Sequence, residues 1–366
     1  MTFLRTERTR LRPPAEGDRD LWVRLHTDPA QYPLAPWARA ADPQAAGATF
    51  ERALAHWAEH GFGYGVVEDA TGEALGVAGV IHGREREHLN LYYRFDLAHH
   101  GRGLGTEVAR ALVADVVEHR PVLPLVATAR PGHDASIRTA QRAGLRLVGA
   151  AAAGVELPGV PPPAVARARA ADPDDVAPPV VLLAPRAETH RGRLGADARE
   201  GLLDLWCATN DAGGAVGFPP GAPREAVAEA LAAHESALAA GRATAVLLRG
   251  PAGEVLACGF WGAETGPLLT HFRTGYRVMS DPGSRGRNLG RLVLAALHRA
   301  AREDGVEVVA VVARSGLGLS RFYERNGYVE VGRVPGNIRV APGDDRDSIQ
   351  LARRLDDRPM VGDGRP

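Results

Sequence analysis

The 366-residue sequence contains no lysine, so all 44 residues counted as Lys or Arg are arginine. It has 44 Asp and Glu residues as well, which leaves no net charge and no general attraction to nucleic acids or membrane surfaces. This balance argues against a nucleic-acid partner. Together with abundant alanine, glycine and proline, the missing lysine is typical of the coding bias of a GC-rich genome.

Cysteines and long apolar runs are also scarce. The two cysteines, Cys207 and Cys258, fit neither a disulfide framework nor a cysteine-based zinc cluster. The first residues form no apolar signal region, and no run of about 18 apolar residues predicts a membrane span. We therefore expect a cytoplasmic protein with no membrane partner and no metal.

The length predicts two domains, since a domain commonly contains about 100 to 200 residues. Three segments recur in the same order: residues 101–105 at 286–290, residues 129–132 at 313–316, and residues 142–145 at 325–328. A long, nearly constant offset, from 183 to 185 residues, indicates a duplicated domain rather than a solenoid. We predict domains at residues 1–150 and 181–355, a Pro/Ala-rich linker at 151–180 and a flexible tail at 356–366.

Each half alternates strand and helix patterns. We expect strands at residues 64–68, 74–80, 89–95 and 123–127, and again at 244–248, 255–259, 273–279 and 306–312. We expect helices at residues 108–119, 135–142, 290–303 and 319–326. This order of elements indicates an α/β fold in both halves.

Two glycine-rich segments each follow an expected strand and open an expected helix. They are residues 99–107, His-His-Gly-Arg-Gly-Leu-Gly-Thr-Glu, and residues 284–291, Ser-Arg-Gly-Arg-Asn-Leu-Gly-Arg. A diphosphate needs converging donors, and backbone N–H groups at a helix N-terminus supply them together with partial positive charge. Glycine lets the backbone approach the phosphates closely. A tight turn would explain one such loop, but two copies in matching contexts favour phosphate binding.

The two loops resemble motif A of the GNAT acetyltransferase superfamily, (Gln/Arg)-x-x-Gly-x-(Gly/Ala), which binds the pyrophosphate of coenzyme A. The copies depart from it at His100, which stands at the Gln/Arg position, and at Asn288, which replaces the middle glycine. Asparagine adopts left-handed backbone more readily than most residues. The resemblance implies two tandem GNAT domains, each a mixed sheet flanked by helices, with acetyl-CoA as cofactor.

Residues 3–150 resemble the ribosomal-protein N-acetyltransferase branch, through an opening strand at 4–13 and the segment 131–138. That branch often carries a glutamate on the strand before the loop, where this sequence has Asn90. The replacement of this glutamate by Asn90 argues against acid–base chemistry in this half. Glu87 and His88 are nearby substitutes or solvated turn residues, and Ser136 either bonds the cofactor or caps a helix.

Residues 181–355 resemble single-domain acetyltransferases that modify small amines, including antibiotic-resistance enzymes. Residues 216–220 and 321–328 carry this resemblance, the latter through the element Phe-Tyr-x-x-x-Gly-(Phe/Tyr). The resemblance implies that Tyr323 protonates the leaving thiolate and that a backbone N–H near Val278–Met279 holds the acetyl carbonyl. A phenol with a pKa of about 10 suits a thiolate of similar basicity. Packing beside Phe322 is the alternative role for Tyr323.

No general base stands out in the second half. Glu264 and His271 are either acceptor-facing or ordinary surface residues, and a positioned water is another candidate. Residues 344–347, Asp-Asp-Arg-Asp, either attract a cationic acceptor or form a solvated hairpin loop.

The predicted catalytic residue is thus Tyr323. The predicted cofactor-binding residues are His100, Gly101, Arg102, Gly103, Leu104, Gly105, Thr106, Ser136, Val278, Met279, Arg285, Gly286, Arg287, Asn288, Leu289, Gly290 and Arg291. The favoured function is acetyl transfer from acetyl-CoA to a primary amine of a small molecule, in the second half, by a monomer or homodimer. The alternatives are a protein or peptide N-terminus as acceptor in the first half, one half as a non-catalytic CoA-binding scaffold or sensor, and a two-domain acetyltransferase of thiol biosynthesis.

Overall fold

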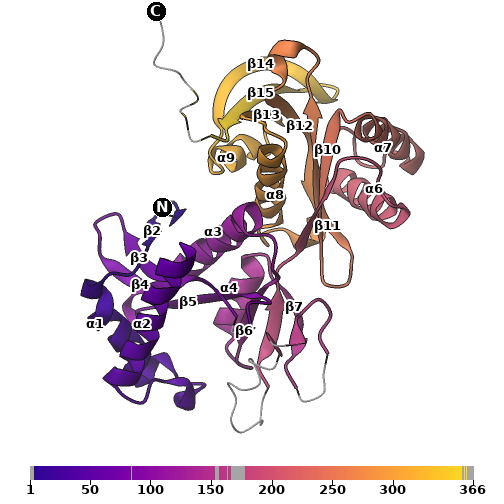
Figure 1. Ribbon diagram of the computed structural model, residues 1–366. Helices are drawn as coiled ribbons and strands as arrows, with labels where there is room; N and C mark the ends of the chain where they lie inside the picture. Colours follow the sequence, from indigo (N-terminus) through magenta and orange to yellow (C-terminus); the bar gives the residue numbers. More distant parts are fainter. Residues whose placement is uncertain are drawn as a thin grey trace, which may run out of the picture. The chain divides into compact units, whose positions relative to one another are not determined.

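The computed structural model describes residues 4–83, 85–152, 156–162, 164–165, 178–356, 358 and 360. The chain divides after Arg186 into two compact units, with residues 286–288 grouped with the first. Each unit is built around a β-sheet of its own (Figure 1). No helix within the described ranges is long and apolar enough to cross a membrane.

The first unit contains an eight-stranded sheet in the order β1-β2-β3-β4-β5-β6-β8-β7. Its strands are β1 (Leu4–Arg5), β2 (Thr9–Arg12), β3 (Tyr64–Asp69), β4 (Ala74–His82), β5 (Leu89–Phe95), β6 (Leu125–Ala129), β7 (Arg146–Ala150) and β8 (Val180–Leu183). Its α-helices are α1 (Arg19–Thr27), α2 (Pro43–His60), α3 (Leu104–His119) and α4 (Asp134–Arg142).

The second unit contains a seven-stranded sheet in the order β14-β15-β13-β12-β11-β10-β9. Its strands are β9 (Arg186–His190), β10 (Ala243–Arg249), β11 (Val255–Ala263), β12 (Phe272–Ser280), β13 (Val308–Arg314), β14 (Val329–Ala341) and β15 (Asp344–Arg354). Its α-helices are α6 (Ala196–Asp211), α7 (Arg224–Ala239), α8 (Leu289–Glu303) and α9 (Leu319–Glu324).

Both sheets are mixed and share one topology. In each, a single parallel pair, β5–β6 or β12–β13, stands among antiparallel neighbours. In each sheet, the last strand in sequence lies between the parallel pair and the strand that precedes it in the chain. β8 lies between β6 and β7, and β15 lies between β13 and β14. The predicted α/β class, with two mixed sheets flanked by helices, is confirmed.

Apolar residues in consecutive positions along the strands allow the second sheet to pack against helices on both faces. Ala245 and Leu247 belong to the core under α6 and α7, as does Phe260 on β11. Neighbouring residues in a strand point to opposite faces, and Trp261 accordingly donates its indole N–H to the carbonyl of Leu297 in α8, at 2.7 Å. Figure 1 shows α8 on one side of this sheet and α6 and α7 on the other.

The first sheet extends beyond the predicted domain boundary at residue 150. β8 pairs with both β6 and β7, and residues Ala151, Leu157, Val160, Ala164 and Val165 are buried in a core with Val181. The described part of segment 151–180 therefore packs on the first unit, because β8 is the counterpart of β15 and completes the sheet. We propose that the first domain ends after β8; residues 153–155, 163 and 166–177 of the predicted linker lie outside the described residues, as does most of the predicted tail.

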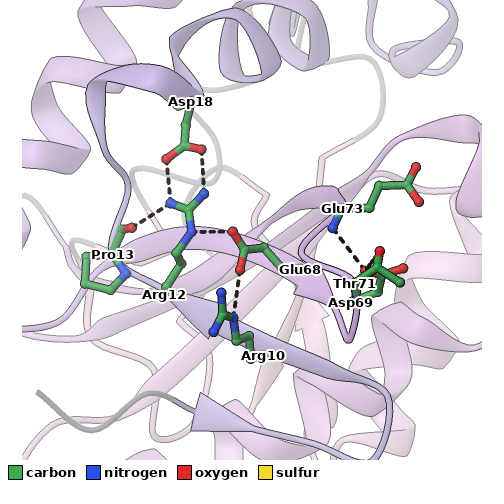
Figure 2. A network of polar contacts seen from close by, with 8 residues as sticks. All are labelled: Arg10, Arg12, Pro13, Asp18, Glu68, Asp69, Thr71 and Glu73. Atoms are coloured by element: carbon green, nitrogen blue, oxygen red, sulfur yellow. Dashed lines mark hydrogen bonds and ion pairs between the residues drawn. The ribbon is translucent and has the colours of Figure 1, made fainter.

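An ion-pair network fixes β2 to β3 and to the start of α1 (Figure 2). Arg12 donates to both carboxylate oxygens of Asp18, at 2.6 and 2.7 Å, and to Glu68, at 2.5 Å, while Arg10 donates to Glu68 at 2.8 Å. Burial alone would raise the pKa of Glu68, but the hydrogen bonds from Arg12 and Arg10 outweigh it and lower that pKa. The two buried carboxylates therefore remain charged in the folded protein.

We expect Arg12→Met to destabilise the first unit by about 3 kcal/mol, because it leaves two largely buried carboxylates without their shared partner. Arg10→Met is the matched control and should cost about 1 kcal/mol or less, since Arg10 is about half exposed. The pKa of Asp18 and that of Glu68 are lowered on folding, so their stabilisation is present above the unfolded pKa values and is lost as the pH falls. Urea unfolding at pH 7 and pH 3 should show the effect of Arg12→Met shrinking at the lower pH; a pH-independent effect would contradict this explanation.

Candidate functional site

The two parallel strands of the second sheet separate before they end. β12 and β13 pair from Phe272 and Val308 to Gly275 and Val311. Residues 276–280 and 312–314 continue both strands without pairing to each other, and we call this stretch the second fork. The chain leaves β12 towards α8 and β13 towards α9, so both helices begin near the carboxyl ends of the strands, where open α/β sheets commonly bind ligands.

A β-bulge in β12 lies inside the second fork. The pairing with β11 shifts between Cys258↔Met279 and Phe260↔Tyr276, so that one residue of β11 opposes both Arg277 and Val278. Arg277 has a φ of 53°, a left-handed conformation that is uncommon for arginine. Bulges redirect backbone groups, and this one acts on the segment Val278–Met279 that is predicted to hold the acetyl carbonyl.

The predicted phosphate loop of this unit follows β12 directly. Asp281 begins it by accepting from the backbone N–H of Gly283, at 3.0 Å, and from the hydroxyl of Ser284, at 2.6 Å. Asn288 has a φ of 62°, so it adopts the conformation that the replaced glycine would supply. α8 then begins at Leu289, whose side chain is buried.

Three arginines hold the segment after α6 against the second fork. Arg285 donates to the carbonyl of Ala212, at 3.3 Å, and Arg314 donates to the carbonyl of Gly213, at 3.4 Å. The guanidinium of Arg277 occupies the space that a β-carbon at Gly217 would need. Residues 212–217 thus form one rim of the site.

Two side chains beside this rim contain enclosed polar atoms that lack hydrogen-bond partners among the described residues. Asn210 is only 1% exposed, and neither its amide nitrogen nor its oxygen is bonded. Arg277 lies over the Trp206 ring at 5.0 Å, and its Nε atom is enclosed without a partner. An unpaired buried polar group costs about 1–3 kcal/mol, so a polar ligand bonded to these atoms would relieve that cost.

Tyr323 lies in α9 and is 7% exposed. Its ring contacts those of Phe322 and Tyr328 edge-on, with centroids 5.1 and 5.4 Å away, and no hydrogen bond of its hydroxyl is found within the described ranges. Phe322 in turn lies against Gly290, so α9 packs at the start of α8. Burial raises the pKa of the Tyr323 phenol, so the phenol keeps its proton at neutral pH but is a weaker acid than the free phenol whose acidity matches that of a thiolate.

An aromatic cavity of about 150 Å³ lies on the α7 side of the second sheet, between α7, β11 and β12. His234 stacks on Phe260, with ring centroids 4.6 Å apart, and Tyr276 completes the wall just before the bulge. Burial lowers the pKa of His234 to about 4, and the positive charge of Arg277 contributes to the shift. At neutral pH the imidazole is uncharged.

The first unit has a corresponding fork. β5 and β6 pair only at Leu89↔Leu125 and Asn90↔Val126, and residues 91–95 and 127–129 form the first fork. The following loop has a φ of 75° at both Gly101 and Gly103, and no side chain caps α3. The N–H groups of residues 104–106 therefore point outward without a helical acceptor. This geometry suits phosphate oxygens.

Other polar groups of the first loop already make contacts within the first unit. His100 bonds through Nε2 to the carbonyl of Phe95, at 3.1 Å, and the carbonyl of Arg102 accepts from Arg8, at 2.9 Å. Thr106 lies 3.5 Å from the hydroxyl of Thr139. These contacts hold the loop in one shape.

The first fork differs from the second where acetyl chemistry is expected. The register of β4 with β5 is unbroken from Gly76↔Phe95 to His82↔Leu89, so β5 has no bulge. Asn90 donates to the hydroxyl of Tyr64, at 2.7 Å. Gln31 donates to the carbonyl of Phe95, at 3.1 Å, and so covers the end of β5.

The other candidate residues from the sequence lie away from the forks or interact with other residues. Glu264 accepts from Thr274, at 2.6 Å, near the start of β12, and His271 is exposed just before that strand. His88 is buried rather than solvated. Ser136 does not cap α4; its carbonyl accepts from the Tyr93 hydroxyl, at 2.9 Å.

Residues 344–347 form the start of β15 rather than a hairpin loop. Asp345 pairs with Arg339, at 2.7 Å, and Asp347 pairs with Arg333, at 2.9 Å, while Asp344 pairs with Arg346. These carboxylates are neutralised within the β14–β15 ribbon. A cationic acceptor would have to compete with arginines for them.

Sequence reasoning missed Asn210, Arg277 and Arg314. A signal for Asn210 exists, because it follows Leu203 and Trp206 at helical spacing and therefore shares their core-facing side of α6. The sequence gives no such signal for Arg277. Its position is set by a bulge, and the bulge depends on how β12 pairs with β11.

A comparison with family models finds a match in the first half of the chain. Residues 8–146 match the family model described as "Acetyltransferase (GNAT) domain". None of the curated proteins compared with the chain matches it.

Many solved structures resemble about half of the chain. An acetyltransferase from Agrobacterium tumefaciens is 25% identical, covers 50% of this chain and 94% of its own, and has a TM-score of 0.39. A ribosomal-protein-alanine N-acetyltransferase from Brucella melitensis is 19% identical over 44% of this chain and 98% of its own, with a TM-score of 0.37. A Salmonella typhimurium acetyltransferase solved with its cofactor acetyl-CoA is 18% identical over 49% of this chain and 99% of its own, with a TM-score of 0.38.

Proposed function

Because residues 8–146 form a GNAT acetyltransferase domain, an N-acyltransferase that uses acyl-CoA, we propose that this chain transfers acetyl from acetyl-CoA to an amine. We propose further that the acceptor is a primary amine of a small molecule and that the transfer takes place in the second unit.

One observation carries the assignment to the second unit: the bulge at Arg277–Val278 inside the second fork. A thioester carbonyl that becomes an oxyanion needs a backbone donor aimed at it, and such donors typically lower the barrier by about 3–4 kcal/mol. The bulge frees N–H groups of β12 from the ladder at that position. The unbroken β5 of the first unit offers no equivalent.

The reaction requires one bond to form and one to break. The neutral amine nitrogen attacks the acetyl carbonyl carbon, the C–S bond breaks, and the nitrogen loses a proton to water. The thiolate of coenzyme A takes its proton from the Tyr323 hydroxyl, which regains one from solvent. His234, with a pKa of about 4, is too weak a base to be the main proton acceptor at neutral pH.

The aromatic cavity supports a small acceptor. Its volume of about 150 Å³ is below the 300–1,000 Å³ typical of drug-sized ligand sites. Its walls include the neutral ring of His234 and the ring of Phe260, which suit an apolar or aromatic group, and Arg242 adds a positive charge to the lining. A peptide would instead need an open groove.

We propose that the first unit binds coenzyme A without turnover. The open N–H groups at the start of α3 support binding. The unbroken register of β5 and the Asn90–Tyr64 hydrogen bond argue against catalysis there. Protein or peptide N-terminal acetylation in this unit is the competing function.

The test is coenzyme A release from acetyl-CoA by the full chain with a panel of aromatic and aliphatic amines, aminoglycosides, polyamines, amino acids and peptides. We expect turnover with a small amine and none with peptides. Turnover confined to peptides would contradict the proposed acceptor.

A further inference from the structure

Three histidines of the first unit converge at the end of the sheet opposite the first fork, where β4 ends and β5 begins. His56 and His60 lie one turn apart at the end of α2, and His82 is the last residue of β4. His82 pairs with Leu89, the first residue of β5, whereas the first fork begins beyond Asn90. The cluster is therefore separate from the site described above.

The three rings are close enough to share one ion. One ring nitrogen from each residue lies within 4.8 Å of the others. In a tetrahedral zinc site with Zn–N bonds of about 2.0–2.1 Å, ligand nitrogens are about 3.4 Å apart. Small side-chain rotations would close the remaining difference.

A backbone hydrogen bond orients the His56 ring within the cluster. His56 lies with Nδ1 2.8 Å from the carbonyl of Phe62, which places the proton on Nδ1 and leaves Nε2 as the acceptor. Hydrogen bonds of this kind orient histidine ligands of metals.

One nitrogen of the cluster has no partner within the described ranges. His82 Nδ1 is enclosed and makes no hydrogen bond. Its neighbours in the cluster offer only weak contacts: the backbone N–H of His82 lies 3.2 Å from His56 Nε2, and His60 Nε2 lies 3.5 Å from the Glu59 carboxylate. A metal ion bound here would take the place of the long hydrogen bond at His56 Nε2, and the unbonded Nδ1 of His82 is one of the two nitrogens that this ring could offer it.

The nearby charges are balanced. Glu59 forms an ion pair with Arg86, and Arg120, which lies over the Phe62 ring at 4.6 Å, forms an ion pair with Asp115. The approach of a cation is therefore not opposed by an unpaired positive charge from these residues.

We propose that His56, His60 and His82 bind one zinc ion, which links the end of α2 to the end of β4. Imidazole nitrogens suit zinc, and three histidines leave a fourth position for water. The ion would strengthen a junction that the His82 N–H···His56 Nε2 hydrogen bond and the contacts between the three rings already form.

The test uses the full chain without an affinity tag, freed of metal by a chelator. Zinc titrated in competition with a chromophoric chelator should show one tight site per chain, and cobalt in place of zinc should give the visible absorption of a tetrahedral centre. Zinc at a hundredfold excess over Kd should raise the Tm by about 5 °C.

His60→Gln and His82→Gln should each weaken zinc binding by at least about a hundredfold, since even the loss of an outer-shell partner costs about 10–100-fold. His271→Gln, an exposed histidine of the second unit, is the matched control and should bind zinc as the unaltered chain does. Circular dichroism of the metal-free variants checks that each is folded. Zinc binding equal in the unaltered chain and in His60→Gln, or a cobalt complex without tetrahedral absorption, would overturn the proposal.

Discussion

Replacing Tyr323 with phenylalanine is expected to lower kcat by about a hundredfold, the usual contribution of a positioned general acid. The ring and its edge contacts with Phe322 and Tyr328 are kept, so the affinity for acetyl-CoA should change little. The hydroxyl makes no hydrogen bond within the described ranges, so its removal leaves no other polar group without a hydrogen bond. Steady-state CoA release and calorimetric binding measure the two effects separately.

Tyr328→Phe is the matched control for this experiment. Tyr328 belongs to the same ring cluster, but its hydroxyl bonds to Nε2 of His298, at 2.9 Å. Removing it should reduce stability by about 1 kcal/mol and leave kcat near the unaltered value. A Tyr323→Phe variant that turns over at the full rate would reduce Tyr323 to a packing residue.

Gly290→Glu is expected to abolish coenzyme A binding in the second unit and to lower turnover at least a hundredfold. A β-carbon at Gly290 would meet the Phe322 ring at 3.4 Å, close to ordinary contact, so the fold should tolerate the change. The added carboxylate, however, lies in the first turn of α8, where it would repel the pyrophosphate.

Gly105→Glu places the same charge in the first turn of α3 and is the matched variant. Its β-carbon would lie 3.7 Å from the Phe95 ring. Calorimetry should count two acetyl-CoA molecules per chain before substitution and one in each variant, with turnover retained only in Gly105→Glu. A stoichiometry of one that survives Gly105→Glu would show that the first loop does not bind the cofactor.

The periodicity of the sequence was sufficient to predict β3–β6, β10–β13, α3, α4, α8 and α9, whereas α1, α2, α6, α7, β7–β9, β14 and β15 were not predicted. β5 spans the predicted residues 89–95, and α4 and α8 each begin one residue before their predicted starts. These elements are recognisable because apolar spacing and glycine-rich breaks are local signals. The α/β class followed from such local patterns, whereas the GNAT resemblance came from the glycine-rich loops and agrees with the family match at residues 8–146.

The site was less predictable because its decisive features are not local. The bulge at Arg277 depends on how β12 pairs with β11, and the placement of β8 depends on a strand inserting after a long excursion. The histidine cluster joins residues from α2 and β4 that no single spacing rule connects. Only His56 and His60, four residues apart on one helix, carried a readable signal.

The central claim, that acetyl transfer resides in the second unit, is tested most directly by dividing the chain between β8 and β9. Residues 1–184 and 185–366 would be produced separately, checked for folding by thermal melting, and assayed for CoA release with an amine that the intact chain acetylates. We predict turnover by residues 185–366 and none by residues 1–184. Turnover found only in the folded first fragment would contradict the claim and would favour a protein or peptide N-terminus as the acceptor.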